Sequence, residues 1–183
     1  MLLLIRNRSQ QPKALGTRSP SGALRCAAAC AAALLFCAAG VAAEPAAAPG
    51  DAAAAGAEVF ANRCAVCHGP QAAGIPGTFP SLHEQIVAFS KSPEGRDYLI
   101  MVVTTGLMGT LKVGGVGYNG VMPAQSGLSE AEVAAVLSFL AGGLGKGEPA
   151  AAALSAKDVV EARARHPDRA AQSTRALRPA TDP

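Results

Sequence analysis

Apolar residues recur at the three- and four-residue spacing of helices in several stretches of the chain. Segments rich in glycine and proline separate these stretches, which cover about 51–64, 84–89, 92–105, 129–141 and 155–165. Within them, Ser129-Glu130-Ala131-Glu132 is a capping box, and apolar residues follow it until Gly142-Gly143. The pattern therefore predicts an all-α fold.

The first predicted helix carries a face suited to close packing. Asp51 can cap its start, and Gly56, Phe60 and Cys64 follow one another at a spacing of four residues. Gly56 leaves room for a second helix to cross, and Phe60 has the size to fill the crossing. We expect this face to be buried.

One segment departs from the helical pattern. Residues 110–113 and 116–118 flank Gly114-Gly115, which fits a tight hairpin that delivers the chain to Met122. Glycine pairs are equally compatible with a flexible loop. The sequence leaves both interpretations open.

Residues 1–43 have the features of a secretory signal. A basic start free of acidic residues precedes the apolar run 26–40, and Val41-Ala42-Ala43 supplies the small residues typical of a cleavage site. We expect cleavage before Glu44 and export to the periplasm. If the leader is retained, it would anchor the chain in the membrane, because its apolar run is only slightly shorter than a membrane span.

The charge of the chain resides mainly in this leader. The whole sequence has 16 Lys and Arg and 13 Asp and Glu, a formal net charge of +3. Five of the basic residues lie in the leader, so residues 44–183 hold 11 basic residues against 13 acidic ones, a net charge of −2. A mildly acidic chain without a basic patch argues against nucleic-acid binding.

The motif with the most specific chemistry is Cys64-Ala65-Val66-Cys67-His68. Its two thiols can add to the vinyl groups of a haem, and the adjacent imidazole can ligate the iron. A zinc site would need two further ligands, and beyond the leader only the distant His83 and His166 remain, both expected at the surface. A thioredoxin-like dithiol would need a strand-helix-strand unit, which the pattern lacks. The motif therefore predicts one covalently bound haem c, with His68 as an iron ligand.

Met122 is the predicted second axial ligand. Pro123 biases it toward an extended backbone, which suits a loop that turns one side chain inward. Met101 lies within a predicted helix, and Met108 sits among glycines with no proline after it. With no tryptophan and only 4% aromatic residues, the domain is expected to use the haem as part of its core.

These residues make 51–144 resemble a class I c-type cytochrome, with Cys64, Cys67 and His68 near the end of the first helix, Met122 downstream and an amphipathic helix last. The resemblance implies helices wrapped around one covalently bound haem. It also implies that the carbonyl of Pro80, in Phe79-Pro80-Ser81-Leu82, accepts a hydrogen bond from His68 and orients the ring. Pro76 is the alternative candidate for that role.

The remaining segments are expected to lie outside the haem domain. Residues 44–50, rich in alanine and proline, are predicted to be a flexible linker. Residues 145–183 are predicted to be a largely disordered extension with one helix over about 155–165, more consistent with a solvated tail than with a docking segment.

The predicted function is that of a periplasmic mono-haem cytochrome that carries single electrons between redox partner proteins and is not an enzyme. One alternative is the cytochrome c subunit of a periplasmic dehydrogenase complex. Another is a haem sensor or catalyst with an open distal site, if Met122 does not ligate the iron.

Overall fold

The computed structural model describes residues 49–144 and 153–180. The chain divides into two units, Met1–Glu44 and Pro45–Pro183, and all described residues lie in the second. The predicted secretory signal, the cleavage site and most of the predicted linker lie outside the described residues. No helix in the part that the structure describes has the length and apolar character needed to cross a bilayer.

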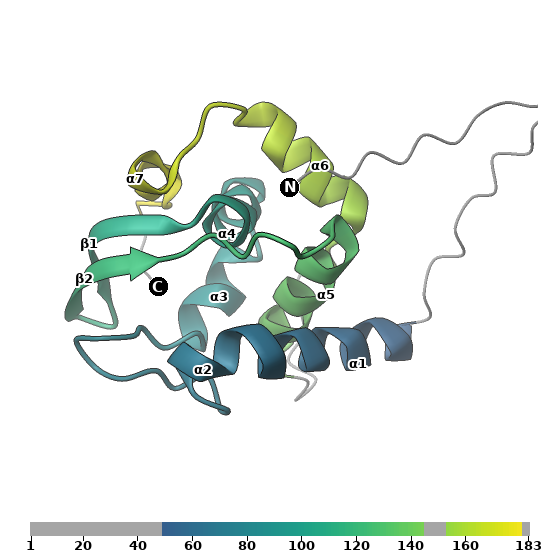
Figure 1. Cartoon of the computed structure of the whole chain (residues 1–183), viewed down its shortest axis with the longest axis horizontal. Helices are drawn as coiled ribbons and strands as arrows, with labels where there is room; N and C mark the ends of the chain where they lie inside the picture. The colour runs from purple at the N-terminus through teal and green to yellow at the C-terminus, as the bar shows by residue number, and fades with distance from the viewer. Residues whose placement is uncertain (1–48, 145–152, 181–183) are drawn as a thin grey trace, which may run out of the picture. The chain divides into compact units, whose positions relative to one another are not determined.

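The described part is mostly helical, with one two-stranded hairpin (Figure 1). The first elements are α1 (Pro49–Val59), the π-helical turn η1 (Phe60–Cys64), α2 (Ala65–His68), α3 (Glu84–Phe89) and α4 (Pro93–Thr105). The hairpin strands β1 (Leu107–Val113) and β2 (Val116–Met122) come next. The chain then continues through α5 (Glu130–Ala141), α6 (Ala156–Arg165), α7 (Ala171–Thr174) and the 3₁₀ turn η2 (Arg175–Leu177).

Helix α1 packs across α5, as the spacing of Gly56, Phe60 and Cys64 predicts. A Cβ added to Gly56 would lie 2.7 Å from the Cβ of Phe139 and would collide with the carbonyl of Ala135. The rings of Phe60 and Phe139 lie 5.9 Å apart and fill the crossing. The predicted start of this helix is wrong, because α1 begins at Pro49 and Asp51 lies in its first turn.

The caps of the central helices are those that the sequence predicts. Ser92 accepts a hydrogen bond from the backbone amide of Gly95 at the start of α4. Ser129 and Glu132 form the reciprocal capping box of α5. Both helices contribute fully buried side chains to the core, among them Ile100, Met101, Val133 and Leu137.

The segment around Gly114-Gly115 is a hairpin and not an irregular loop. Strands β1 and β2 pair antiparallel with Leu107 opposite Met122 and Val113 opposite Val116. Gly114 and Gly115 have φ values of 55° and 78°, as the favoured two-residue hairpin turn requires. The register therefore fixes where Met122 lies.

The prediction of a largely disordered C-terminal extension is wrong for residues 153–180. Helix α6 begins with a capping box of Ser155 and Asp158 and packs on α4 and α5. Val159 and Ala162 on α6 have no exposed surface and belong to the same core cluster as Leu99 of α4. This part of the extension therefore contributes to the folded domain.

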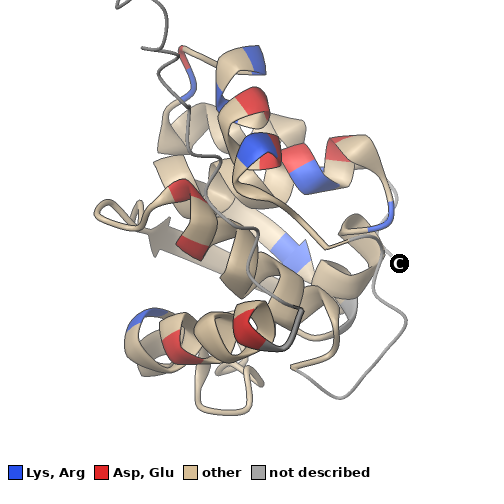
Figure 2. Ribbon diagram, turned by 90° about the vertical axis from the view of Figure 1, so that its right-hand side faces the viewer, with Lys and Arg blue, Asp and Glu red and all other residues tan. Residues whose placement is uncertain are grey.

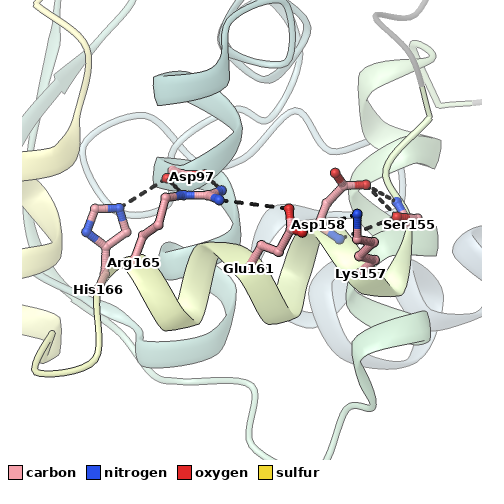
Figure 3. A network of polar contacts seen from close by, with 7 residues as sticks. All are labelled: Asp97, Ser155, Lys157, Asp158, Glu161, Arg165 and His166. Atoms are coloured by element: carbon pink, nitrogen blue, oxygen red, sulfur yellow. Dashed lines mark hydrogen bonds and ion pairs between the residues drawn. The ribbon is translucent and has the colours of Figure 1, made fainter.

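A polar network joins the end of α6 to α4 (Figure 3). Arg165 donates two hydrogen bonds to the carboxylate of Asp97, at 2.9 and 2.6 Å, and His166 lies 3.2 Å from the same carboxylate. The hydrogen bond from Arg165 lowers the pKa of Asp97. The network therefore stabilises the fold above the unfolded-state pKa, and this contribution is lost as the pH falls through the folded-state pKa.

The last part of the extension runs along the hairpin. The hydroxyls of Thr105 and Thr174 lie 2.9 Å apart, and Arg175 donates to the carbonyl of Thr110. Acidic and basic residues are interspersed on the ribbon in Figure 2. Arg163 of α6 pairs with Glu130 at 2.8 Å. The extension is thus held both by buried apolar side chains and by polar contacts to distant parts of the chain.

Candidate functional site

The two cysteines and the histidine of the motif lie where α1 passes into α2. The π-helical turn Phe60–Cys64 separates the two helices, whereas the sequence predicts one uninterrupted helix to Cys64. Such turns are common at functional sites, because the extra residue redirects the side chains that follow. Cys64 and Cys67 are free thiols and half-buried, and Val66 between them is 83% exposed.

Burial and the neighbouring Cys67 both raise the pKa of the Cys64 thiol. Burial contributes most, because a low-dielectric surrounding disfavours the thiolate. A raised thiol pKa argues against a reactive redox dithiol, whose attacking cysteine has a lowered pKa.

His68 is oriented by Pro80. The ring is only 7% exposed, and its Nδ1 lies 2.8 Å from the carbonyl oxygen of Pro80. A carbonyl can only accept, so Nδ1 carries the proton and donates, which leaves Nε2 as the metal-binding nitrogen. Burial lowers the pKa of His68, although the bond to Pro80 acts in the opposite direction. The hydrogen bond implied by the resemblance is formed by Pro80 and not by Pro76.

Glycine lets the loop after the motif approach His68 closely. Gly74, at φ 70°, donates from its amide to the carbonyl of His68. A Cβ at this position would lie 2.6 Å from the backbone of Pro80. The loop therefore brings the Pro80 carbonyl to the ring only because residue 74 has no side chain.

Met122 lies at the end of β2 and lines the same cavity as Cys64, Cys67 and His68. Met101 is 1% exposed and packs in the protein core, away from the cavity lining. Met108 lies on the opposite face of β1 from Leu107 and Gly109, which line the cavity. Among the described methionines, Met122 is thus the one in position to serve as a ligand.

Gly106 holds the Met122 segment against the end of α4. At φ 83°, this residue would place a Cβ 2.7 Å from the carbonyl oxygen of Met122. The amide of Gln125 donates to the carbonyl of Val103 at 2.8 Å and fixes the chain after Pro123. Gly106 directly follows a predicted helix, but this position alone does not mark it as part of the site.

The cavity has a volume of about 690 Å³ and is lined mainly by apolar side chains from α3, α4, β1 and α5. Its size and apolar lining suit a large flat cofactor, and its sulfur and imidazole groups suit covalent attachment and iron ligation. Among the described residues, no three His, Cys, Asp or Glu side chains gather as a zinc site would require. The residues present therefore fit a c-type haem.

Comparison with known proteins agrees with this chemistry. A family model described as Cytochrome c matches residues 53–143. Cytochrome c-552 of Thermus thermophilus is 43% identical over 86 residues, which are 47% of this chain and 65% of that protein. A second cytochrome c-552, from one particular strain of the same species, is also 43% identical over 86 residues, which are 57% of its length. The match thus spans less than two thirds of either relative.

The fold and the site define a haem-binding domain, and the family match states its class. Residues 53–143 form a cytochrome c domain of class I, whose cofactor is covalently bound haem c. When bound, haem supplies an iron that takes up and releases one electron. The residues that would hold it are the chain's own: Cys64 and Cys67 are placed for its attachment, Pro80 orients His68, and Met122 would offer a soft sulfur ligand.

Proposed function

We propose that the protein is an exported mono-haem electron carrier that works in the periplasm and passes single electrons between redox partner proteins. The observation that supports this best is that His68, oriented by Pro80, and Met122 line the same cavity as the attachment cysteines. These two side chains would fill both axial positions of the iron, which leaves none for a substrate. An open-site sensor or catalyst would need Met122 to lie elsewhere.

The exchange of electrons requires a place where a partner can approach the haem. Val66 and Val121 both line the cavity and are 83% and 59% exposed. Exposed apolar side chains at the rim of a cavity are suited to a short-lived contact. If the protein is instead the cytochrome c subunit of a dehydrogenase complex, the same rim would contact a permanently bound partner and not a transient one.

Replacing Met122 with histidine tests the ligand assignment. Imidazole stabilises ferric iron more than a thioether does, so we expect a lower reduction potential and loss of the near-infrared methionine band, with the haem still attached. The fall should be a substantial part of the roughly 0.8 V range that axial ligands span. Potentiometry and absorption spectra measure both effects.

Met108→His is the matched control, because Met108 lies on the face of the hairpin that points away from the cavity. This variant should leave the spectrum unchanged. The wild-type ferrous protein should also fail to bind carbon monoxide, since no axial position is open. Rapid binding of carbon monoxide would refute the carrier proposal. A methionine band that survives in Met122→His would instead refute the assignment of Met122 as the ligand.

Export is tested by the mature N-terminus. Since Val41-Ala42-Ala43 is the small-residue exit after the apolar run, we expect periplasmic protein to begin at or near Glu44 and to carry the mass of one haem. N-terminal sequencing and intact mass spectrometry of an osmotic-shock extract measure this. Recovery in the membrane fraction with residues 1–43 intact would instead support an anchored carrier.

A further inference from the structure

The charged side chains of the cavity lining are all basic. They are the guanidinium groups of Arg63 and Arg178, and no Asp or Glu among the described residues lines the cavity. A haem brings its own carboxylates into such a cavity, in its propionate groups. A partly buried carboxylate is costly unless a hydrogen-bonded cation faces it.

The two arginines lie on different walls of the cavity. Arg63 is exposed and directly precedes Cys64, at the attachment side. Arg178 comes from the end of the C-terminal extension and reaches the wall formed by α3, α4 and β1. Because the propionates of a haem project from the edge away from the thioether-forming vinyl groups, the Arg178 wall is the one suited to receive them.

Arg178 is held firmly in place there. Its Nη2 donates to Oε1 of Gln85 and to the carbonyl of Lys112, each at 2.9 Å. Its guanidinium lies 5.1 Å from the ring centre of Phe89 and 5.9 Å from that of Tyr98. Stacking on aromatic rings and a fixed fork of donors are the features that make arginine suited to binding a carboxylate.

We propose that Arg178 binds a haem propionate, so that the C-terminal extension supplies a residue of the haem site. Arg178 lies outside residues 53–143, the part that matches the family model. A cation at this position disfavours ferric iron and neutralises the propionate, and both effects raise the reduction potential. The inference rests on the haem being attached at Cys64 and Cys67.

The test compares Arg178→Gln with Arg175→Gln in the full-length haem-loaded protein. Arg175 is a matched control, since it also joins the extension to a β1 carbonyl but does not line the cavity. At a fixed ambient potential near neutral pH, Arg178→Gln should raise the ferric to ferrous ratio by roughly threefold to tenfold, and Arg175→Gln should leave it unchanged.

The pH dependence of the reduction potential is a second measurement. It should change only if Arg178 binds a propionate, and not if Arg178 merely stabilises the fold. Loss of Arg178 should raise the propionate pKa, so the potential of Arg178→Gln should fall as the pH rises through that pKa. Other titratable groups of the lining, apart from the attachment and ligand residues, are the phenols of Tyr98 and Tyr118 and the guanidinium of Arg63. Arg178→Lys keeps the charge and should restore most of the potential.

Two results would overturn the proposal. One is an unchanged potential and pH profile in Arg178→Gln, and the other is an equal shift in Arg175→Gln, which would indicate a general loosening of the extension. If Arg178→Gln does not hold haem, the wild-type protein still tests the proposal. Its reduction potential should not change with pH near neutrality, whereas an unpaired propionate would make the potential pH-dependent there. The pyridine haemochrome spectrum of the wild type separately tests whether haem is bound at all.

Discussion

Replacing both Cys64 and Cys67 with alanine is expected to leave a protein without haem and with a largely unfolded domain. The reason is the cavity of about 690 Å³ between α3, α4, the hairpin and α5, whose lining is mainly apolar. Without a filling cofactor, these side chains lose their packing partners. Folded domains have a net stability of only roughly 5–15 kcal/mol, and an unfilled apolar cavity of this size is large against that margin.

Circular dichroism melting and intact mass spectrometry measure the outcome. Val66→Ala is the control within the motif, because Val66 is largely exposed and has no thiol, so this variant should keep both the haem and the melting temperature of the wild type. A double cysteine variant that melts cooperatively near the wild-type temperature would show that the chain fills its core without haem.

The residues of the site were predictable because their chemistry is encoded locally. Cys64, Cys67 and His68 are contiguous in the sequence, so no fold is needed to bring them together. Pro80 was expected only from the resemblance, and its 2.8 Å bond to His68 depends on a loop that closes through Gly74. The sequence pattern alone does not predict that this loop approaches His68 so closely.

The segment that carries Met122, the predicted second axial ligand, was predicted less completely. The sequence favours Met122 because Pro123 follows it, but the glycine pair at 114–115 fits a loop as well as a hairpin. The pairing of Leu107 with Met122 decides between them, and this pairing depends on tertiary contacts. The π-helical turn before Cys64 is likewise invisible in the sequence, because its residues suit an ordinary helix equally well.

The C-terminal extension was misjudged for a similar reason. Helix α6 buries only two small apolar side chains, Val159 and Ala162, and half of its ten residues are charged. Its other anchors, such as Arg165 on Asp97, join residues 68 positions apart. A composition that looks solvated can therefore pack when its few apolar residues share one face and its charges find distant partners.

Ending the chain after Gly147 should consequently destabilise the haem domain. The truncation removes Val159, Ala162 and Thr174, each without exposed surface, and uncovers the faces of α4 and α5 beneath them. Burying a valine side chain contributes about 1.5–3 kcal/mol, so the total loss should be on the order of 3–5 kcal/mol. The ion pairs contribute less, because Arg165 is about half exposed and solvent screens it.

Two adjacent single substitutions test whether the packing of α6, and not only the presence of the extension, stabilises the domain. Val159→Ala should lower the free energy of unfolding by roughly 1–3 kcal/mol, whereas Val160→Ala should change it by less than about 0.5 kcal/mol, since Val160 is 54% exposed. Chemical denaturation of the haem-loaded proteins measures both. If the truncated chain and Val159→Ala unfold like the wild type, α6 does not stabilise the domain. If the truncated chain is destabilised and its potential falls as in Arg178→Gln, the extension both holds the fold and sets the chemistry of the haem site.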